Sequence, residues 1–100
     1  MKALIVNGYD IRTVVSDILV KYPDIRETPE YESLQDLYIE YTMSCDPSEQ
    51  QAWMKHYISK GLSMLEHSSN MIIQKQYNSA KGLEFEAYLN IIVAYDLLGD

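Results

Sequence analysis

Apolar residues recur at the spacing of a helix face along most of this chain, and few residues interrupt the pattern. Prolines and glycines, which end or kink helices, number only three and four. Between Asp10 and Pro23, the apolar residues follow the i, i+3, i+4, i+7, i+8 order of an amphipathic helix. They are Ile11, Val14, Val15, Ile18 and Leu19. We therefore predict a first helix over residues 10–22.

Capping residues locate the starts of two further helices. Thr28 is a residue type that caps helices, and Pro29 after it suits the first helical position. Asp46 and Pro47 repeat this signal, and Glu49, three residues after the cap, strengthens it. We therefore predict a second helix from residue 28 and a third from residue 46. The face of the second helix that should be buried contains Tyr31, Leu34, Leu37, Tyr38 and Tyr41.

The predicted third helix has the widest apolar surface of the chain. At roughly 100° per residue, its apolar positions cover about half of the circumference. They are Trp53, Met54, Tyr57, Ile58, Gly61, Leu62, Met64 and Leu65. We therefore expect the third helix to be the central element, with a break at Ser68-Ser69-Asn70.

The last third of the chain is compatible with one helix or with two. We expect two, with a turn at Asn78–Gly82. A single helix through Gly82 is the alternative, because a glycine inside a helix costs only about 1 kcal/mol relative to alanine. Residues 3–6 have the composition of a short strand, and since no second strand candidate follows, a second subunit would have to complete it. The prediction is an all-α bundle of four to five helices in one domain over residues 1–100, with room for a short N-terminal extended segment.

Composition places the chain among folded proteins of the cytoplasm. It is 47% hydrophobic and 23% charged, outside the range of disordered chains. The single cysteine, Cys45, excludes a disulfide within the chain. The apolar run at the N-terminus is too short for the core of a signal peptide, and no stretch approaches the ~20 apolar residues of a membrane span. We therefore expect a soluble, cytoplasmic protein.

The sequence offers no constellation of residues for catalysis or for metal binding. It contains no glycine-rich phosphate-binding motif and no HExxH, GxSxG or paired-cysteine motif. His56 and His67 would stand about 16 Å apart along one helix, too far to share a metal ion. Asp46 beside Cys45 should raise the pKa of the thiol and suppress its thiolate form. We expect a protein that is not an enzyme and that needs no cofactor or metal.

The charges are distributed unevenly along the chain. Residues 24–49 hold eight carboxylates and one arginine, so this segment carries the entire formal net charge of −7. Within it, Glu32, Asp36 and Glu40 recur every four residues on the polar side of the second helix, with no lysine at the positions that could pair with them. Ile39 and Met43 project close to these carboxylates and should be exposed. The sequence thus predicts a surface that combines negative charge with apolar side chains.

Such a surface would suit a basic, partly apolar partner protein. Nucleic acid itself should be repelled by a chain with a pI of about 4.6 and no basic helix. We include nucleic-acid-binding proteins among the expected partners, because carboxylates can occupy the places of phosphates in a basic groove. The hypothesis is a small acidic inhibitor or regulator, of the kind that phages and mobile elements encode. An ordinary solvated helix face, with Ile39 and Met43 reaching another element or subunit, and a cation site are the alternatives.

Two rival functions belong to other classes. Lys55 and Lys60 with His56 and His67 share the polar side of the third helix, where a small anionic ligand such as a nucleotide could bind. The second rival is a structural or regulatory homo-oligomer, such as a homodimer, in which the second helix of one copy meets the basic side of the third helix in another. Nine tyrosines favour an interface of some kind, since tyrosine is common where a buried surface stays close to water.

Overall fold

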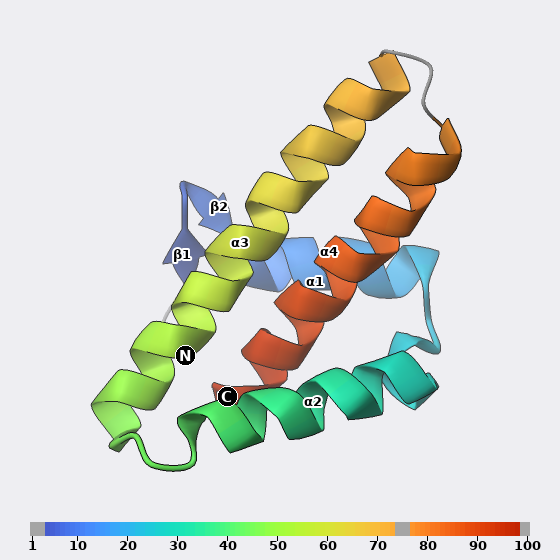
Figure 1. Cartoon of the computed structure of the whole chain (residues 1–100). Helices are drawn as coiled ribbons and strands as arrows, with labels where there is room; N and C mark the ends of the chain where they lie inside the picture. The colour runs from blue at the N-terminus through green and yellow to red at the C-terminus, as the bar shows by residue number, and fades with distance from the viewer. Residues whose placement is uncertain (1–3, 74–76, 99–100) are drawn as a thin grey trace.

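Two long helices, α3 and α4, lie side by side and antiparallel; α1 and α2 pack against α4, and the N-terminal hairpin lies beside α3 (Figure 1). The computed structural model describes the backbone of residues 4–73 and 77–98 and the side chains of residues 4–70 and 81–98. In chain order the elements are β1 (Ile5–Val6), β2 (Tyr9–Asp10), α1 (Ile11–Lys21), the short 3-10 helix η1 (Ile25–Glu27), α2 (Pro29–Thr42), α3 (Pro47–Ile73) and α4 (Tyr77–Leu97). This confirms the predicted all-α fold with a short extended segment at the N-terminus.

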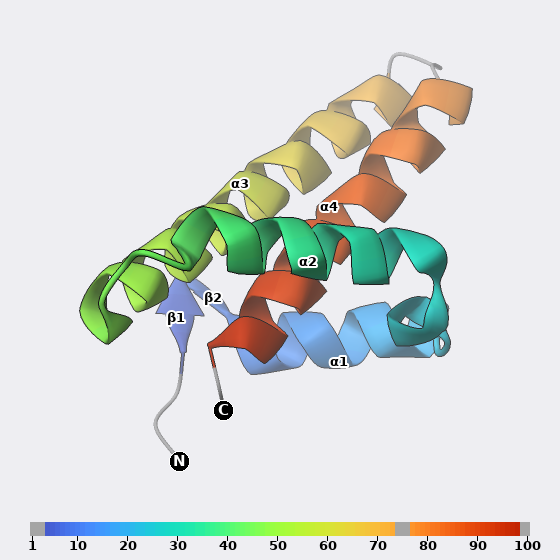
Figure 2. The same ribbon diagram turned by 60° about the horizontal axis from the view of Figure 1, so that its bottom comes forward.

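Helix α4, rather than α3, is the central element. Its C-terminal half lies between α1 and α2 while α3 runs alongside, and every residue from Leu89 to Ala94 is buried (Figure 2). The sequence Ile91-Ile92-Val93-Ala94 is apolar all round the helix, as expected of a helix surrounded by others. The prediction that α3 is the central helix was wrong, because its wide apolar stripe covers only one side of the helix. Trp53, which belongs to that stripe, is 47% exposed.

Among the described residues, no helix is both long and apolar enough to cross a membrane.

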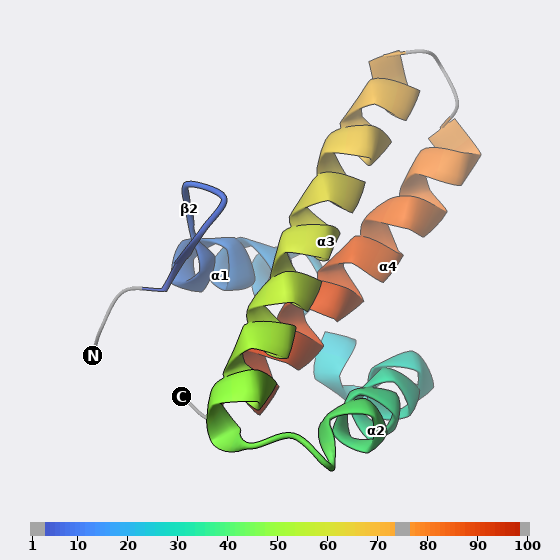
Figure 3. The same cartoon turned by 60° about the vertical axis from the view of Figure 1, so that its left-hand side comes forward.

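Gly61 allows α3 and α4 to approach each other closely along the helical pair that Figure 3 shows. A Cβ atom built on Gly61 would lie 2.6 Å from Cγ1 of Ile91 and 3.0 Å from the backbone oxygen of Ala87. Because real Cβ atoms essentially never lie within 3.0 Å of another heavy atom, a larger residue would require Ile91 or the helix backbones to shift. The glycine therefore sets the distance between the two longest helices.

Both helix boundaries expected in the last third of the chain were wrong. Helix α3 continues through Ser68-Ser69-Asn70 to Ile73, and α4 runs from Tyr77 straight through Gly82. Ser68 is buried, so packing against the bundle outweighs its weak helix propensity. Gly82 is exposed, a Cβ added to it would have no neighbour within 4 Å, and its cost to the helix is small. Residues 74–76, between the helices, lie outside the described residues.

The N-terminal strand finds its partner within the chain, which corrects the expectation of a second subunit. β1 pairs with β2 in an antiparallel hairpin, with Val6 opposite Tyr9. Asn7 and Gly8 form the turn with φ angles of 52° and 82°. Positive φ at both positions defines the tight turn that suits the twist of a two-residue hairpin, and Asn-Gly is its commonest sequence. The Asn7-Gly8 dipeptide is thus the sequence signal for this hairpin.

Local capping determines where the helices begin, as the sequence predicts. The Thr28 side chain accepts a hydrogen bond from the Tyr31 backbone N–H at 3.2 Å, and Asp46 accepts one from the Glu49 backbone N–H at 2.9 Å. The buried face of α2 was predicted only in part. Tyr31 and Tyr38 are buried, but Tyr41 and Leu37 are exposed, and Thr42 is buried in their place. Helix α2 therefore packs on α4 along a narrower line than its apolar residues suggest.

Candidate protein-binding surface on helix α2

The three carboxylates predicted to form a binding surface are all exposed. Glu32, Asp36 and Glu40 lie on consecutive turns of α2. Tyr31 and Tyr38 are buried on the same helix, and at about 100° per residue they place the carboxylates on the side turned away from α4. We call Glu32, Asp36 and Glu40 the acidic stripe.

The two cations that form ion pairs among the described side chains bind carboxylates of α4 and not those of α2. Arg26, the one basic residue of segment 24–49, binds Asp96 of α4 through two hydrogen bonds of 3.0 Å and 2.9 Å. Lys21 of α1 pairs with Glu84 of α4. These are the two ion pairs among the described side chains, and neither includes the acidic stripe. The acidic stripe is therefore exposed and unpaired within the described part of the chain.

The bidentate pair of Arg26 and Asp96 also fixes the orientation of α2. Asp96 accepts a further hydrogen bond from the hydroxyl of Tyr31, in the first turn of α2. Hydrogen bonding to Asp96 raises the pKa of Arg26. Burial, followed by the hydrogen bond to Asp96, raises the pKa of Tyr31 to about 12. The start of α2 is thus tied to the end of α4, which determines the direction in which the stripe faces.

Ile39 and Met43 are exposed, as predicted, with 45% and 72% of their surface open to water. Together with Thr42 they form one wall of a hollow of about 320 Å³ where α2, α3 and α4 meet. Its other walls come from Gln50, Met54 and Leu97. At about 100° per residue, Ile39 and Met43 lie beside the acidic stripe on α2. Negative charge and an apolar hollow are therefore adjacent. The sequence indicated that Ile39 and Met43 lie close to the carboxylates, but it did not indicate the hollow.

A larger hollow, which the sequence reasoning missed, lies on the other side of α2. It is an open groove of about 490 Å³ between α2 and α4. Leu34, Leu37 and Leu89 supply its apolar surface, and Glu30 and Glu86 are its charged lining residues. The sequence pattern predicts Leu34 and Leu37 in the core, because they share a face with Tyr38. Helix α4 does not cover this part of the face, so it remains a groove.

The alternative ligand site on α3 is more dispersed. Lys55, Lys60, His56 and His67 are all exposed. Lys55 and Lys60 are five residues apart and therefore point about 140° away from each other around the helix. His56 packs edge-on against Trp53, with 5.7 Å between the ring centres. Neither lysine lines the two hollows described above, so the anionic-ligand site stays a prediction.

Two further features concern chemistry within the described residues. No group of three or more His, Cys, Asp or Glu side chains there is arranged to hold a metal ion. Cys45 is a free thiol of intermediate exposure between α2 and α3. Burial, followed by the charge of Glu49, raises the pKa of this thiol, and Asp46 adds to the shift. A raised thiol pKa disfavours the thiolate that a nucleophile requires.

Comparisons with protein-family models, with curated proteins and with solved structures find no match for this chain. The surface of the molecule itself is therefore the basis for its proposed function.

Proposed function

We propose that this chain is a small, acidic, non-catalytic binding module that acts as an inhibitor or regulator of another protein. The acidic stripe of α2 would dock on a basic and partly apolar surface of the partner, with Ile39 and Met43 in the contact. The observation that carries the proposal is the open charge of Glu32, Asp36 and Glu40, none of which belongs to an ion pair among the described side chains.

Electrostatics supports a partner of positive charge. Successive carboxylates of the stripe are four residues apart, or about 6 Å along the helix axis. Like charges at this spacing destabilise the helix slightly when it stands alone. Cations on a partner would attract these carboxylates, which offsets their mutual repulsion, and would accelerate association of the two proteins. A basic groove that otherwise holds nucleic acid meets this description, which places nucleic-acid-binding proteins among the partners that we propose.

The apolar hollow beside the stripe supports a contact that is more than electrostatic. Surface ion pairs alone contribute only about 0–1 kcal/mol each. Exposed Ile39 and Met43, next to buried Met54, offer apolar area that a partner side chain could cover. Salt would weaken the charged part of such an interface and leave the apolar part.

The proposal is tested by charge reversal with a charge-matched control. The triple variant Glu32→Lys, Asp36→Lys, Glu40→Lys reverses the stripe. The control, Asp17→Lys, Glu27→Lys, Glu66→Lys, makes the same change of net charge at exposed positions on α1, η1 and α3. Proteins captured from an extract of the native cells are identified, and their affinities are measured as a function of salt.

We expect a partner that binds the wild type and the control, loses at least tenfold in affinity for the stripe variant, and binds more weakly as salt rises. Equal binding to both triple variants, or binding that salt does not affect, would contradict the proposal. Both variants should unfold at nearly the wild-type temperature, because none of the substituted carboxylates belongs to an ion pair among the described side chains.

A further inference from the structure

Buried hydrogen bonds hold one wall of the groove between α2 and α4 in place. Asn90, in its lining, accepts a hydrogen bond from the hydroxyl of Tyr38 and donates one of 2.9 Å to the backbone oxygen of Glu86. Tyr38 and Asn90 are only 4% and 5% exposed. Because both polar groups of the Asn90 side chain are engaged, the wall of the groove is held in one arrangement.

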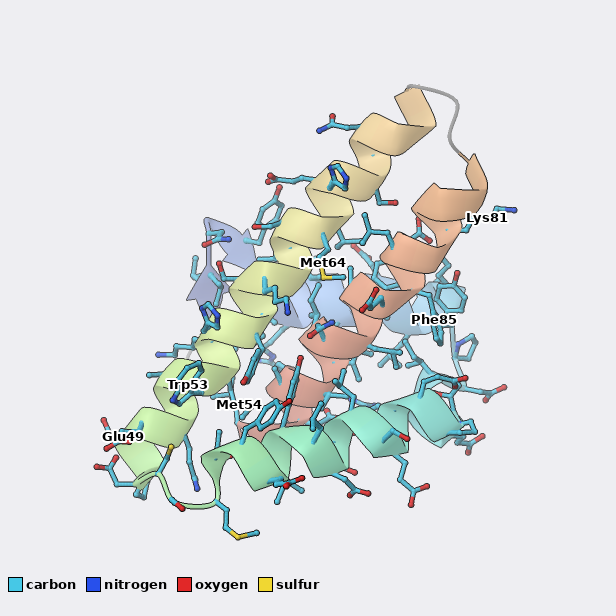
Figure 4. The ribbon with its side chains drawn as sticks, viewed as in Figure 1. Glu49, Trp53, Met54, Met64, Lys81 and Phe85 are labelled. Atoms are coloured by element: carbon cyan, nitrogen blue, oxygen red, sulfur yellow. The ribbon has the colours of Figure 1, made fainter. Side chains whose placement is uncertain are left out.

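Tyr38, which hydrogen-bonds to Asn90 in the lining of the groove, also begins a series of stacked rings that reaches α3. The ring of Tyr38 stacks on Tyr57 with 4.0 Å between centres, and Tyr57 stacks on Trp53 at 6.0 Å. Trp53 projects from the N-terminal half of α3, where Figure 4 labels it, and it is 47% exposed. Tyr41, one turn beyond Leu37 on α2, is 59% exposed. Tryptophan and tyrosine are among the residue types that dominate the binding energy of protein interfaces, and both are exposed here.

The charges of the groove restrict its occupant. Glu30 and Glu86 are exposed, neither forms an ion pair among the described side chains, and no basic residue lines the groove. An uncharged or acidic occupant would cover these carboxylates without compensation, which is costly. A segment with basic side chains on its flanks would pair with them. The occupant is therefore expected to be apolar in the middle and basic at its edges.

The backbone of the occupant must also satisfy its own hydrogen bonds. Ser33 is the one polar lining residue of the groove, besides the carboxylates, whose side chain is not already hydrogen-bonded within the described residues. An extended segment would therefore lose backbone hydrogen bonds to water when it is buried there. A helix keeps these bonds within itself, and an amphipathic helix lays its apolar face into a groove of this kind.

From these observations we propose that the groove between α2 and α4 binds a basic amphipathic helix of a partner protein. Apolar side chains of that helix would cover Leu34, Leu37 and Leu89, and its cations would pair with Glu30 and Glu86. This inference rests on the proposed protein-binding function and adds a second contact on the other side of α2 from Ile39 and Met43.

The inference is tested by nuclear magnetic resonance with a defined probe. The probe is a synthetic amphipathic helix with leucine on one face and lysine on the other, and a matched peptide carries glutamate in place of lysine. Leu37→Glu changes the groove at a position that is 37% exposed. Val20→Glu is the matched control, because Val20 is an exposed apolar residue of α1 that does not line the groove.

We expect the lysine peptide to shift the backbone resonances of Leu34, Leu37 and residues 86–90 in a saturable way. Leu37→Glu should weaken this binding at least tenfold, Val20→Glu should leave it unchanged, and the glutamate peptide should not bind. Shifts confined to the acidic stripe and unaffected by Leu37→Glu would overturn the groove inference while leaving the proposed function intact. Absence of binding, equal binding of the glutamate peptide, or a wild-type dimer that Leu37→Glu dissociates would also overturn it.

Discussion

Asp96 shows how a single residue positions the candidate surface. It lies near the end of α4, and it binds both Arg26 of η1 and Tyr31 of α2. The carboxylate thereby joins α4 to η1 and to α2, through residues that precede Asp96 by 70 and 65 positions in the sequence. Because Arg26 is used in this contact, the cation nearest in sequence to the acidic stripe does not neutralise it.

Tyr31 should make the stability of the fold depend on pH in the alkaline range. Its pKa is raised to about 12 in the folded chain, against 10.0 for an ordinary tyrosine. A raised pKa means that the folded state holds the proton more tightly, so its contribution to stability is complete below pH 10 and is lost as pH rises toward 12. We expect the free energy of unfolding to fall over this range, and to fall less steeply in Tyr31→Phe. Urea denaturation at several pH values measures both slopes, and identical slopes would contradict the assignment.

The buried hydrogen bond between Tyr38 and Asn90 should behave as a coupled pair. Asn90→Leu removes the acceptor and leaves the hydroxyl of Tyr38 buried without a partner, at a cost of about 1–3 kcal/mol. Tyr38→Phe in the same chain removes the stranded hydroxyl and should recover part of that loss. Denaturant unfolding of the two single variants and the double variant gives the coupling energy. Strictly additive effects would show that the two side chains do not interact.

At the level of elements, the two helical glycines provide a matched pair of substitutions. Gly61→Ala places a Cβ against Ile91 and Ala87, so we expect a loss of about 1–3 kcal/mol of stability. Gly82→Ala meets nothing within 4 Å and should raise stability by up to about 1 kcal/mol through higher helix propensity. Thermal unfolding of both variants tests the close approach of α3 and α4. A stabilising Gly61→Ala would refute that packing.

Helix starts could be predicted from the sequence because their causes are local. Thr28 and Asp46 cap the helices that follow them whatever the rest of the chain does. The continuity of α3 through Ser68 and of α4 through Gly82 could not be predicted in the same way. Ser68 is buried by packing between segments distant in sequence, which outweighs its own preference, and Gly82 costs α4 too little to end the helix. The central position of α4 depends likewise on which helices surround it.

The candidate surface could likewise be predicted only in part, since the exposed carboxylates could be predicted and the groove could not. Exposure of Glu32, Asp36 and Glu40 follows from helical periodicity and from the absence of lysines at pairing positions, both readable along one helix. The groove between α2 and α4 could not be inferred, because it exists only where the packing line on α2 is narrower than its apolar face. Leu37 illustrates the difference, since its spacing indicates burial and the tertiary structure leaves it partly open.

At the level of the whole molecule, charge and apolar surface come together around α2. The chain measures about 43 × 29 × 22 Å, and its formal charge of −7 resides in the segment centred on this one helix. The hollow beside Ile39 and Met43 lies on one side of α2, and the groove lined by Leu37 lies on the other. A partner that surrounds α2 could use all three surfaces at once, with the acidic stripe between two apolar contacts.

Cross-linking with a carbodiimide tests the central claim most directly, because this reagent joins a carboxylate to a lysine only when the two are in contact. The measurement is made on the unmodified chain in an extract of the native cells, and the joined peptides are identified by mass spectrometry. We predict links from Glu32, Asp36 or Glu40 to lysines of a different protein. Links from acids elsewhere only, such as Asp17 and Glu66, or links only to Lys55 and Lys60 of another copy, would contradict this claim.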